Sequence, residues 1–393
     1  MKKKTRIILI TLLVLLAAGI GIALYVLYGN ARALPEHADV DVWYVGNNIM
    51  TEKFGDYTEK FNSEIGKRRD ITVNAKSFDS EEELLKAVDE GKDLPDMVLC
   101  SADAVAYVNG KKLIKYNAEL WNEETIASVD SDLLNACSVD GKLICFPVAA
   151  ESDVLMINKT LFSETDRLDS FEAFCDAANE YYGTNGKYFF TVSDYSALFN
   201  SAMAQLGEQF DADNPFESDN QNVKYIYDKL ATAAFKRGYT AVSENPAELV
   251  SRGELACAIV PAADVMALDN VDSSVLSFMP CPTMRGGKDV YVQRVTGLAM
   301  LKTDEITEMG AIAFAEWFTQ QEINDVFVGF SGFTTKCGTV GTEGETAAPA
   351  AYSALMAAVT SMKHQFYGAN ADYVLKSIEF NDIIDNIMTK SLS

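Results

Sequence analysis

The sequence predicts an α/β protein of two lobes, each a mostly parallel sheet flanked by helices, preceded by an N-terminal transmembrane helix. Three observations lead to this prediction. The chain has 393 residues, more than one hydrophobic core usually holds, so two lobes are expected. From residue 40 onward, short apolar runs alternate with helical patterns, which is typical of parallel sheets covered by helices. Before that point, a basic cluster precedes a long uncharged stretch.

The N-terminus predicts a membrane anchor. A basic cluster at residues 2–6 is followed by an uncharged, apolar run at residues 7–28. A helix of this length, at about 1.5 Å per residue, crosses the hydrocarbon core of a bilayer. Its positive end stays in the cytoplasm, which places the body of the protein outside. The alternative is a secretory signal peptide cleaved at residues 31–33. Residues 1–36 are assigned to the basic stub, the anchor and a tether.

Residues 40–100 predict the first sheet. Strands are expected at residues 40–45, 71–75 and 97–100, where short apolar runs end at turn residues. Between the first two strands, apolar residues recur at helical spacing over residues 54–65. The next helix, at residues 80–91, begins with a Ser-x-x-Glu capping box and ends at a glycine. This order of strand, helix and strand gives a parallel sheet.

Residues 140–162 predict a strand that leaves the first lobe, crosses a hinge and enters the second. An apolar run is interrupted by Pro147, which lacks a backbone donor and does not suit the middle of a sheet. Two alanines lead to a lone acid, Glu151, and a second apolar run follows at residues 154–157. Glu151 is therefore expected between the lobes. A second crossing is predicted at residues 290–301.

The remaining pattern predicts a second sheet and its helices. Strands are expected at residues 188–192, 255–260 and 275–279, and helices at residues 169–182, 222–237 and 306–321, with two closing helices from Ala351 and Asp372. The lobe boundaries follow from the two crossings. Lobe 1 is assigned residues 37–147 plus 297–335, and lobe 2 residues 148–296 plus 336–393.

Polar residues follow the predicted strands of lobe 1. In open α/β sheets, ligands bind outside the carboxyl ends of the strands. Asn47 and Asn48 follow the first strand, and Ser101 and Asp103 follow the third. The same residue types also suit turns and helix caps, so both interpretations stay open.

A second group of polar residues flanks the crossings and a strand end in lobe 2. It completes the candidate ligand-binding set with Glu151, Ser152, Asp264, Gln293 and Arg294. A guanidinium can clamp a carboxylate or phosphate with two hydrogen bonds. Arg294 could act in this way, or it could pair with one of the many acids of the chain.

Charge and residue inventory exclude several classes of function. The chain carries 33 basic and 57 acidic residues, so nucleic acid and anionic lipid surfaces are not expected as partners. Only two histidines are present, and there is no nucleophile elbow, phosphate loop or dinucleotide motif. No His/Cys cluster has zinc spacing. We therefore expect no enzyme, no metal and no cofactor. A carboxylate pair for glycoside hydrolysis is the one alternative that the sequence leaves open, and no motif indicates such a pair.

The seven cysteines are scattered and include no C-x-x-C motif. Exported proteins can form disulfides, and Cys137 and Cys145 are close in sequence. Buried free thiols, which behave as small apolar groups, are the favoured interpretation.

Five segments resemble family 1 extracellular solute-binding proteins, the capture subunits of bacterial ABC importers. Residues 141–162, GKLICFPVAAESDVLMINKTLF, are similar to a family segment with an early Gly-Lys, a central proline and a late Asn-Lys. Four more segments resemble the family in the same order: PDMVL at 95–99, DSFEAF at 169–174, SRGELACAIVPAADV at 251–265 and AFAEWFTQQEINDVF at 313–327.

The resemblance implies a periplasmic-binding-protein-like type II fold that closes around a small solute, a sugar or other small polar molecule, and delivers it to the permease subunits of an ABC importer. Glu151 matches the acid that contacts sugar hydroxyls in such proteins. The aromatic platforms of maltodextrin-type members are replaced here by Cys100-Ser101 and Pro261, which weakens the case for an oligosaccharide. We expect a monomer held at the cell membrane by its N-terminal helix. The alternative is a membrane-anchored sensing or regulatory protein that works with a membrane partner.

Overall fold

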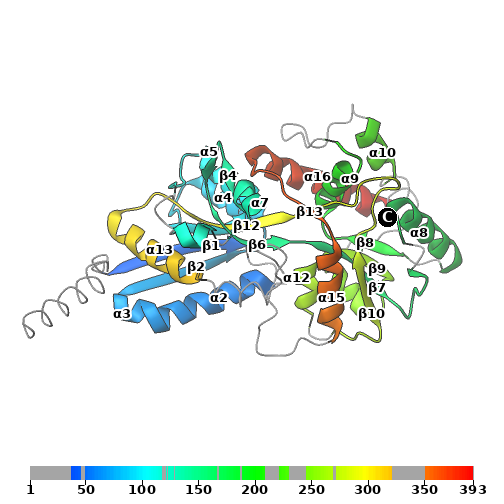
Figure 1. Ribbon diagram of the computed structural model, residues 1–393, viewed down its shortest axis with the longest axis horizontal. Helices are drawn as coiled ribbons and strands as arrows, with labels where there is room; N and C mark the ends of the chain where they lie inside the picture. The colour runs from blue at the N-terminus through cyan, green and yellow to red at the C-terminus, as the bar shows by residue number, and fades with distance from the viewer. Residues whose placement is uncertain are drawn as a thin grey trace, which may run out of the picture.

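Two lobes lie next to each other along the long axis of the computed structural model (Figure 1). The structure describes residues 37–392 except 46–48, 117–120, 122, 128, 166–167, 186–187, 209–220, 230–244, 269–270 and 321–349. Each lobe contains one larger β-sheet with helices packed against it. The predicted two-lobed α/β architecture is therefore confirmed.

Lobe 1 is built on a five-stranded sheet in the order β2-β1-β3-β12-β6. Strands β1 and β2 are parallel, as are β1 and β3, whereas β12 is antiparallel to both of its neighbours. One strand of the five thus runs against the others. The strands are β1 (Ala38–Val45), β2 (Ile71–Phe78), β3 (Met97–Ser101), β12 (Arg294–Met300) and β6 (Phe146–Glu151).

Lobe 2 is built on a four-stranded sheet in the order β10-β7-β9-β8. Strands β8 and β9 are parallel, and β7 is antiparallel to both β9 and β10. Again a single strand runs against the others. The strands are β10 (Leu276–Pro280), β7 (Asp153–Asn158), β9 (Cys257–Pro261) and β8 (Phe190–Val192).

The two reversed strands, β7 and β12, are the strands that enter a lobe from the other lobe. A chain that leaves lobe 1 at the carboxyl end of β6 reaches lobe 2 at the edge facing lobe 1, so β7 must run away from that edge. The same holds for β12, which enters lobe 1 from β11 (Tyr291–Val292). Both observed sheets are mostly parallel, as the sequence predicted. The apolar runs alone did not indicate which strand of each sheet is reversed.

Each crossing contains a single residue between two strands. Ser152 separates β6 from β7, and Gln293 separates β11 from β12. The predicted crossings within residues 140–162 and 290–301 are thus confirmed. Strand β11 pairs in parallel with β13 (His364–Gln365) as a small separate sheet.

Helices cover both faces of the lobe 1 sheet, as Figure 1 shows. Helices α2 and α13 pack on one face, and α4 and α5 on the other. The lobe 1 helices are α2 (Ile49–Phe61), continued by a π-helical turn (Asn62–Gly66) and α3 (Lys67–Arg69), then α4 (Glu81–Glu90), α5 (Ala102–Gly110), α6 (Glu123–Ala127), α7 (Ser131–Ala136) and α13 (Glu305–Phe318). A short hairpin joins β4 (Ser138–Val139) to β5 (Lys142–Leu143).

The second lobe has its own helices around its sheet. They are α8 (Phe171–Asn185), α9 (Tyr195–Gln205), α10 (Gln221–Lys229), α11 (Pro246–Ser251), α12 (Ala262–Met266), α15 (Ala350–Ser361) and α16 (Ala371–Leu392). Helix α9 was not predicted from the sequence, because its apolar residues lie on all sides and give no amphipathic pattern: nine of its residues are buried.

Aromatic packing holds helices α2 and α13 of lobe 1 together. The ring of Phe54 meets that of Phe318 edge to face, with centroids 5.3 Å apart, and meets Phe314 at 6.0 Å. Gly310 lets α13 approach the sheet, because a Cβ there would lie 2.8 Å from the Cβ of Ala38. These close contacts hold α2 and α13 together and against the sheet of lobe 1.

The lobes touch on both sides of the crossings. Helix α16 contacts both α5 of lobe 1 and α9 of lobe 2, and α12 of lobe 2 contacts α2 of lobe 1. Ala263, on α12, is fully buried within the lobe 1 core. The lobe boundaries assigned at residues 147/148 and 296/297 stay predictions.

Two expectations for the chain concern its cysteines and its anchor. The six described cysteines are buried free thiols, including Cys137 and Cys145; Cys337 lies outside the described residues.

In the described part of the chain, no helix has both the length and the apolar character needed to cross a membrane. The predicted anchor at residues 7–28 lies outside that part.

Candidate functional site

The polar residues of both crossings meet at the boundary of the two lobes. Glu151 is the last residue of β6, and Arg294 is the first residue of β12; the two are direct partners in the sheet. Asp153 begins β7, and Asp194 lies just after β8 as the N-cap of α9. The carboxyl ends of strands from both lobes thus face one cluster.

Arg294 is surrounded by three carboxylates. Its Nη2 lies 2.8 Å from Asp153 Oδ1, its Nη1 3.1 Å from Asp194 Oδ2, and its Nε 3.5 Å from Glu151 Oε2. Nη1 also donates to the second oxygen of Asp153 at 3.4 Å. The sequence left two roles open for Arg294, a clamp for an anionic ligand or an ion pair with acids of the chain. The structure shows the ion pair. All three guanidinium nitrogens are engaged.

Carboxylates outnumber cations in this cluster, and burial leaves some of them poorly compensated. Burial raises the pKa of Glu151 to about 7; Arg294 opposes this shift, and the charges of Asp153, Asp264 and Asp194 add to it. Burial and the charge of Asp153 raise the pKa of Asp264 to about 6. Around Asp194, burial acts to raise the pKa, but Arg294 and hydrogen bonds outweigh it and lower the pKa.

We expect the Glu151→Gln variant to be more stable than the parent protein at pH 8. The folded pKa of Glu151 lies at about 7 against an ordinary 4.5, so stability is lost as pH rises through this window. One pKa unit corresponds to about 1.4 kcal/mol; allowing for the residual exposure of the side chain, the gain is about 2 kcal/mol at pH 8. Urea unfolding at pH 4.5 and pH 8 measures it.

The same variant should gain less than about 0.5 kcal/mol at pH 4.5, where the Glu151 carboxyl is protonated in the folded state and already half protonated in the unfolded state. A matched surface variant, Glu254→Gln, should change stability by less than about 0.5 kcal/mol at either pH. An equal gain for Glu151→Gln at both pH values would contradict the shift.

The two crossings are joined at their midpoints by a buried side-chain contact. Ser152 and Gln293, each the single residue between two strands, are both buried, and the Gln293 amide donates to the Ser152 hydroxyl. The Gln293 backbone N–H also donates to the carbonyl of Gln365 at 3.0 Å. Both were predicted as ligand contacts; the structure places them at the two crossings between the lobes, next to Glu151 and Arg294 in the chain.

Ser101 and Asp103 lie at the carboxyl end of β3, but their polar atoms form hydrogen bonds within the protein. Ser101, rather than Asp103, caps α5, since its hydroxyl accepts from the N–H of Ala104 at 3.1 Å. The Ser101 hydroxyl also donates to Glu81 at 2.9 Å. Asp103 accepts from the N–H of Asn370 at 2.7 Å, and burial raises its pKa to about 7. Asn47 and Asn48 lie outside the described residues.

A cavity of about 40 Å³ lies between the lobes beside Arg294. Its polar lining includes Asp103, Asn200, Gln293, Arg294, Tyr367 and Tyr373. One water molecule needs a cavity volume of about 10–15 Å³, so this cavity has room for only a few waters. The cavity is therefore too small for a sugar-sized solute.

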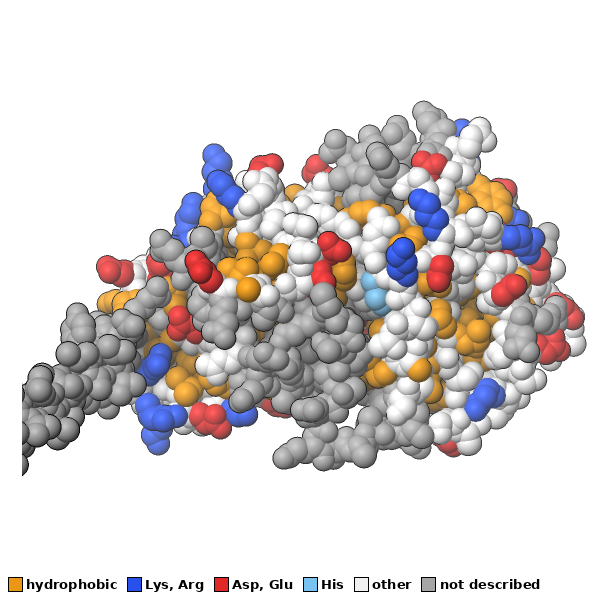
Figure 2. Space-filling view, viewed as in Figure 1, with side chains coloured by type: hydrophobic (Ala, Val, Ile, Leu, Met, Phe, Trp, Pro, Cys, Tyr) orange, Lys and Arg blue, Asp and Glu red, His pale blue; other side chains and the backbone are white. Residues whose placement is uncertain are grey.

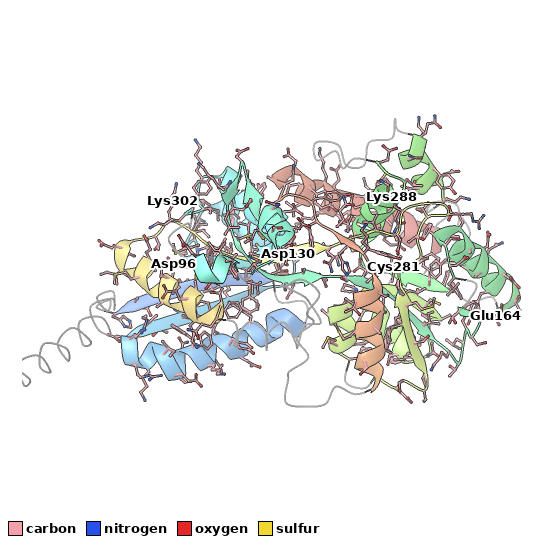
Figure 3. All side chains as sticks on the ribbon, in the orientation of Figure 1. Asp96, Asp130, Glu164, Cys281, Lys288 and Lys302 are labelled. Atoms are coloured by element: carbon pink, nitrogen blue, oxygen red, sulfur yellow. The ribbon has the colours of Figure 1, made fainter. Side chains whose placement is uncertain are left out.

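A second cavity, of about 20 Å³, lies within lobe 2 on the other side of Ser152 and Gln293. Its lining is mostly apolar and includes Cys281, which Figure 3 labels beside the crossings, together with His364. Burial lowers the pKa of His364. This space is too small for more than a water molecule.

Three carboxylates of the site were not predicted: Glu81, Asp153 and Asp194. Asp194 follows a strand and caps a helix. Because ligands bind outside the carboxyl ends of strands in α/β sheets, its position could have indicated a site residue. Glu81 begins a predicted helix and gave no separate signal. Among the described residues, no group of three or more His, Cys, Asp or Glu side chains is arranged to hold a metal ion.

Outside the site, the surface carries mixed charge. Figure 2 shows acidic and basic side chains interspersed over the visible face, without a single large patch of either sign. The exposed Arg252, for example, pairs with both Glu248 and Glu254.

Comparisons with known proteins agree with this architecture. The family model described as bacterial extracellular solute-binding protein matches residues 56–364. A search of curated proteins finds no match.

Solved structures share the fold at low sequence identity. The cyclic alpha-maltosyl-1,6-maltose binding protein from Arthrobacter globiformis has a TM-score of 0.66 at 16% identity, covering 90% of this chain and 94% of that one. The GacH receptor of Streptomyces glaucescens GLA.O, solved unliganded and with acarbose, has a TM-score of 0.69 at 15% identity, covering 91% and 94%.

Proposed function

We infer that this chain, which belongs to the bacterial extracellular solute-binding protein family, captures a small polar solute between its two lobes and delivers it to the permease subunits of an ABC importer. The observation that carries this proposal is the polar cluster of Glu151, Asp264 and Arg294 at the crossings, where two lobes face each other. Such clefts fix a solute by a few polar groups.

The solute class that fits best is a sugar or a sugar-like polyol. Carboxylates accept hydrogen bonds from hydroxyl groups, and the cluster offers several carboxylate oxygens at one place. The two structural neighbours are described as binding a cyclic maltosyl-maltose and acarbose, which supports a carbohydrate. Glu151 and Asp264 are the proposed contacts that come from opposite lobes.

Residues 7–28 are proposed to hold the protein at the outer face of the cell membrane, as a monomer beside its permease. The family assignment favours capture over the alternative of a sensing protein. It also favours binding over catalysis.

A thermal-shift screen of the full-length chain in detergent tests the function. Neutral, amino and acidic mono- and disaccharides form the panel, and a solute present at 100 times its Kd should stabilise the protein by about 2.7 kcal/mol. For any solute found, Glu151→Gln should weaken binding at least tenfold, which is about 1.4 kcal/mol.

The matched control is Glu254→Gln, since Glu254 is an exposed acid on lobe 2 that pairs with Arg252. It should leave the Kd within about twofold. An unchanged Kd in Glu151→Gln would contradict the assignment of the site.

A further inference from the structure

We propose that the solute carries a positive charge, as an ammonium group on a polyhydroxylated skeleton. This inference rests on the proposed function, because it assigns the solute class of the same interlobe site.

The first step is the balance of charge at the site. Three carboxylates, Glu151, Asp153 and Asp194, contact one guanidinium. Two more acids, Glu81 and Asp264, are close enough to interact electrostatically with Arg294. Of the described residues lining the interlobe cavity, Arg294 is the only lysine or arginine. Asp103 is the only acid among the described residues of that lining. The excess of negative charge therefore lies in the five acids that surround or face the Arg294 guanidinium beside the cavity.

The second step is that every nitrogen of the Arg294 guanidinium already contacts a carboxylate of the protein. Nη1 and Nη2 both contact Asp153, Nη1 also contacts Asp194, and Nε faces Glu151. A carboxylate or phosphate solute would have to displace these partners and would then face them at short range. Like charges repel most strongly where water is excluded, so anionic solutes are disfavoured.

The third step is that Arg294 does not fully compensate the acids around it. Burial, and after it the charge of Asp153, raises the pKa of Asp264, and Arg294 only partly offsets this rise. Burial also raises the pKa of Glu151, against the opposing charge of Arg294. A cation bound between the lobes would supply the missing charge and strengthen its own hydrogen bonds.

The fourth step distinguishes an organic cation from a metal ion. In the described part of the chain, the acids are not grouped as metal ligands. Tyr367 and Tyr373 line the cavity together with Asp103 and Arg294. Aromatic faces attract ammonium groups and also pack against the apolar face of a sugar ring, so an amino sugar or amino polyol fits better than a bare ion.

The test compares probes that share a ring and differ in charge. The Kd values of glucosamine, glucose, N-acetylglucosamine and glucuronate are measured calorimetrically with the full-length chain at pH 7, and the galactose and mannose series are measured alongside. In at least one series, the ammonium member should bind at least tenfold tighter than its neutral counterparts, and the acidic member should not bind.

Asp264→Asn should reduce the ratio of neutral to ammonium Kd values to about one, whereas Glu254→Gln should leave that ratio unchanged. A neutral or acidic member that binds as tightly as the ammonium member would overturn this inference while leaving the proposed function standing. If no member of any series bound, a sugar ligand and the ammonium assignment would both be overturned.

Discussion

The Arg294→Met variant is expected to lose about 3–5 kcal/mol of stability at pH 8, because removing one partner of a buried ion pair leaves uncompensated charge behind. Arg294 is paired with Glu151, Asp153 and Asp194, and its side chain is only 28% exposed. Methionine keeps much of the side-chain volume but none of the charge. Urea unfolding at fixed pH measures the loss.

The loss should be smaller at pH 5. Glu151 and Asp264, with pKa values of about 7 and about 6, are then largely protonated and need no partner. Arg252→Met is the matched control, since Arg252 also pairs with two acids but is 54% exposed. Exposed pairs contribute only about 0–1 kcal/mol. A similar small loss for both variants would show that the Arg294 cluster does not stabilise the fold.

The Gly297→Ala variant is expected to lose about 3 kcal/mol, because its methyl group has no room. Gly297 lies in β12, where the pairing with β6 shifts register. A Cβ at this position would lie 2.3 Å from the Sγ and 2.8 Å from the Cβ of Cys145. Relief of that overlap would push β12 away from β6 next to the crossings. Thermal unfolding of the variant measures the loss.

The double variant Gly297→Ala with Cys145→Ala should recover part of this loss, because the sulfur that makes the closest contact is gone. Gly110→Ala is the control, since a Cβ there meets nothing within 4 Å; it should change stability by less than about 0.5 kcal/mol. No recovery in the double variant would mean that the strain lies elsewhere than at Cys145.

Much of the candidate site could be predicted, because its residues follow from patterns within a short stretch of sequence. Glu151 stands alone between two apolar runs, and Ser152, Gln293 and Arg294 follow from recognising the two crossings. Their roles could not be predicted in the same way. Ser152 and Gln293 bond to each other, and the donors of Arg294 go to acids. A polar residue at a crossing can contact a solute or bond to other residues of the protein. Only the distances between side chains in the folded protein distinguish these two roles.

The sequence by itself determined the alternation of strands and helices, the two-lobed α/β class and the place where the chain crosses, because these depend on periodicity and on breaks such as Pro147 within a short window. The tertiary structure decided which strand of each sheet is reversed and which acids surround Arg294. Arg294 meets Asp153 across 141 residues and Asp194 across 100 residues of chain. Partners so far apart are set by how the two lobes pack, which no local pattern contains.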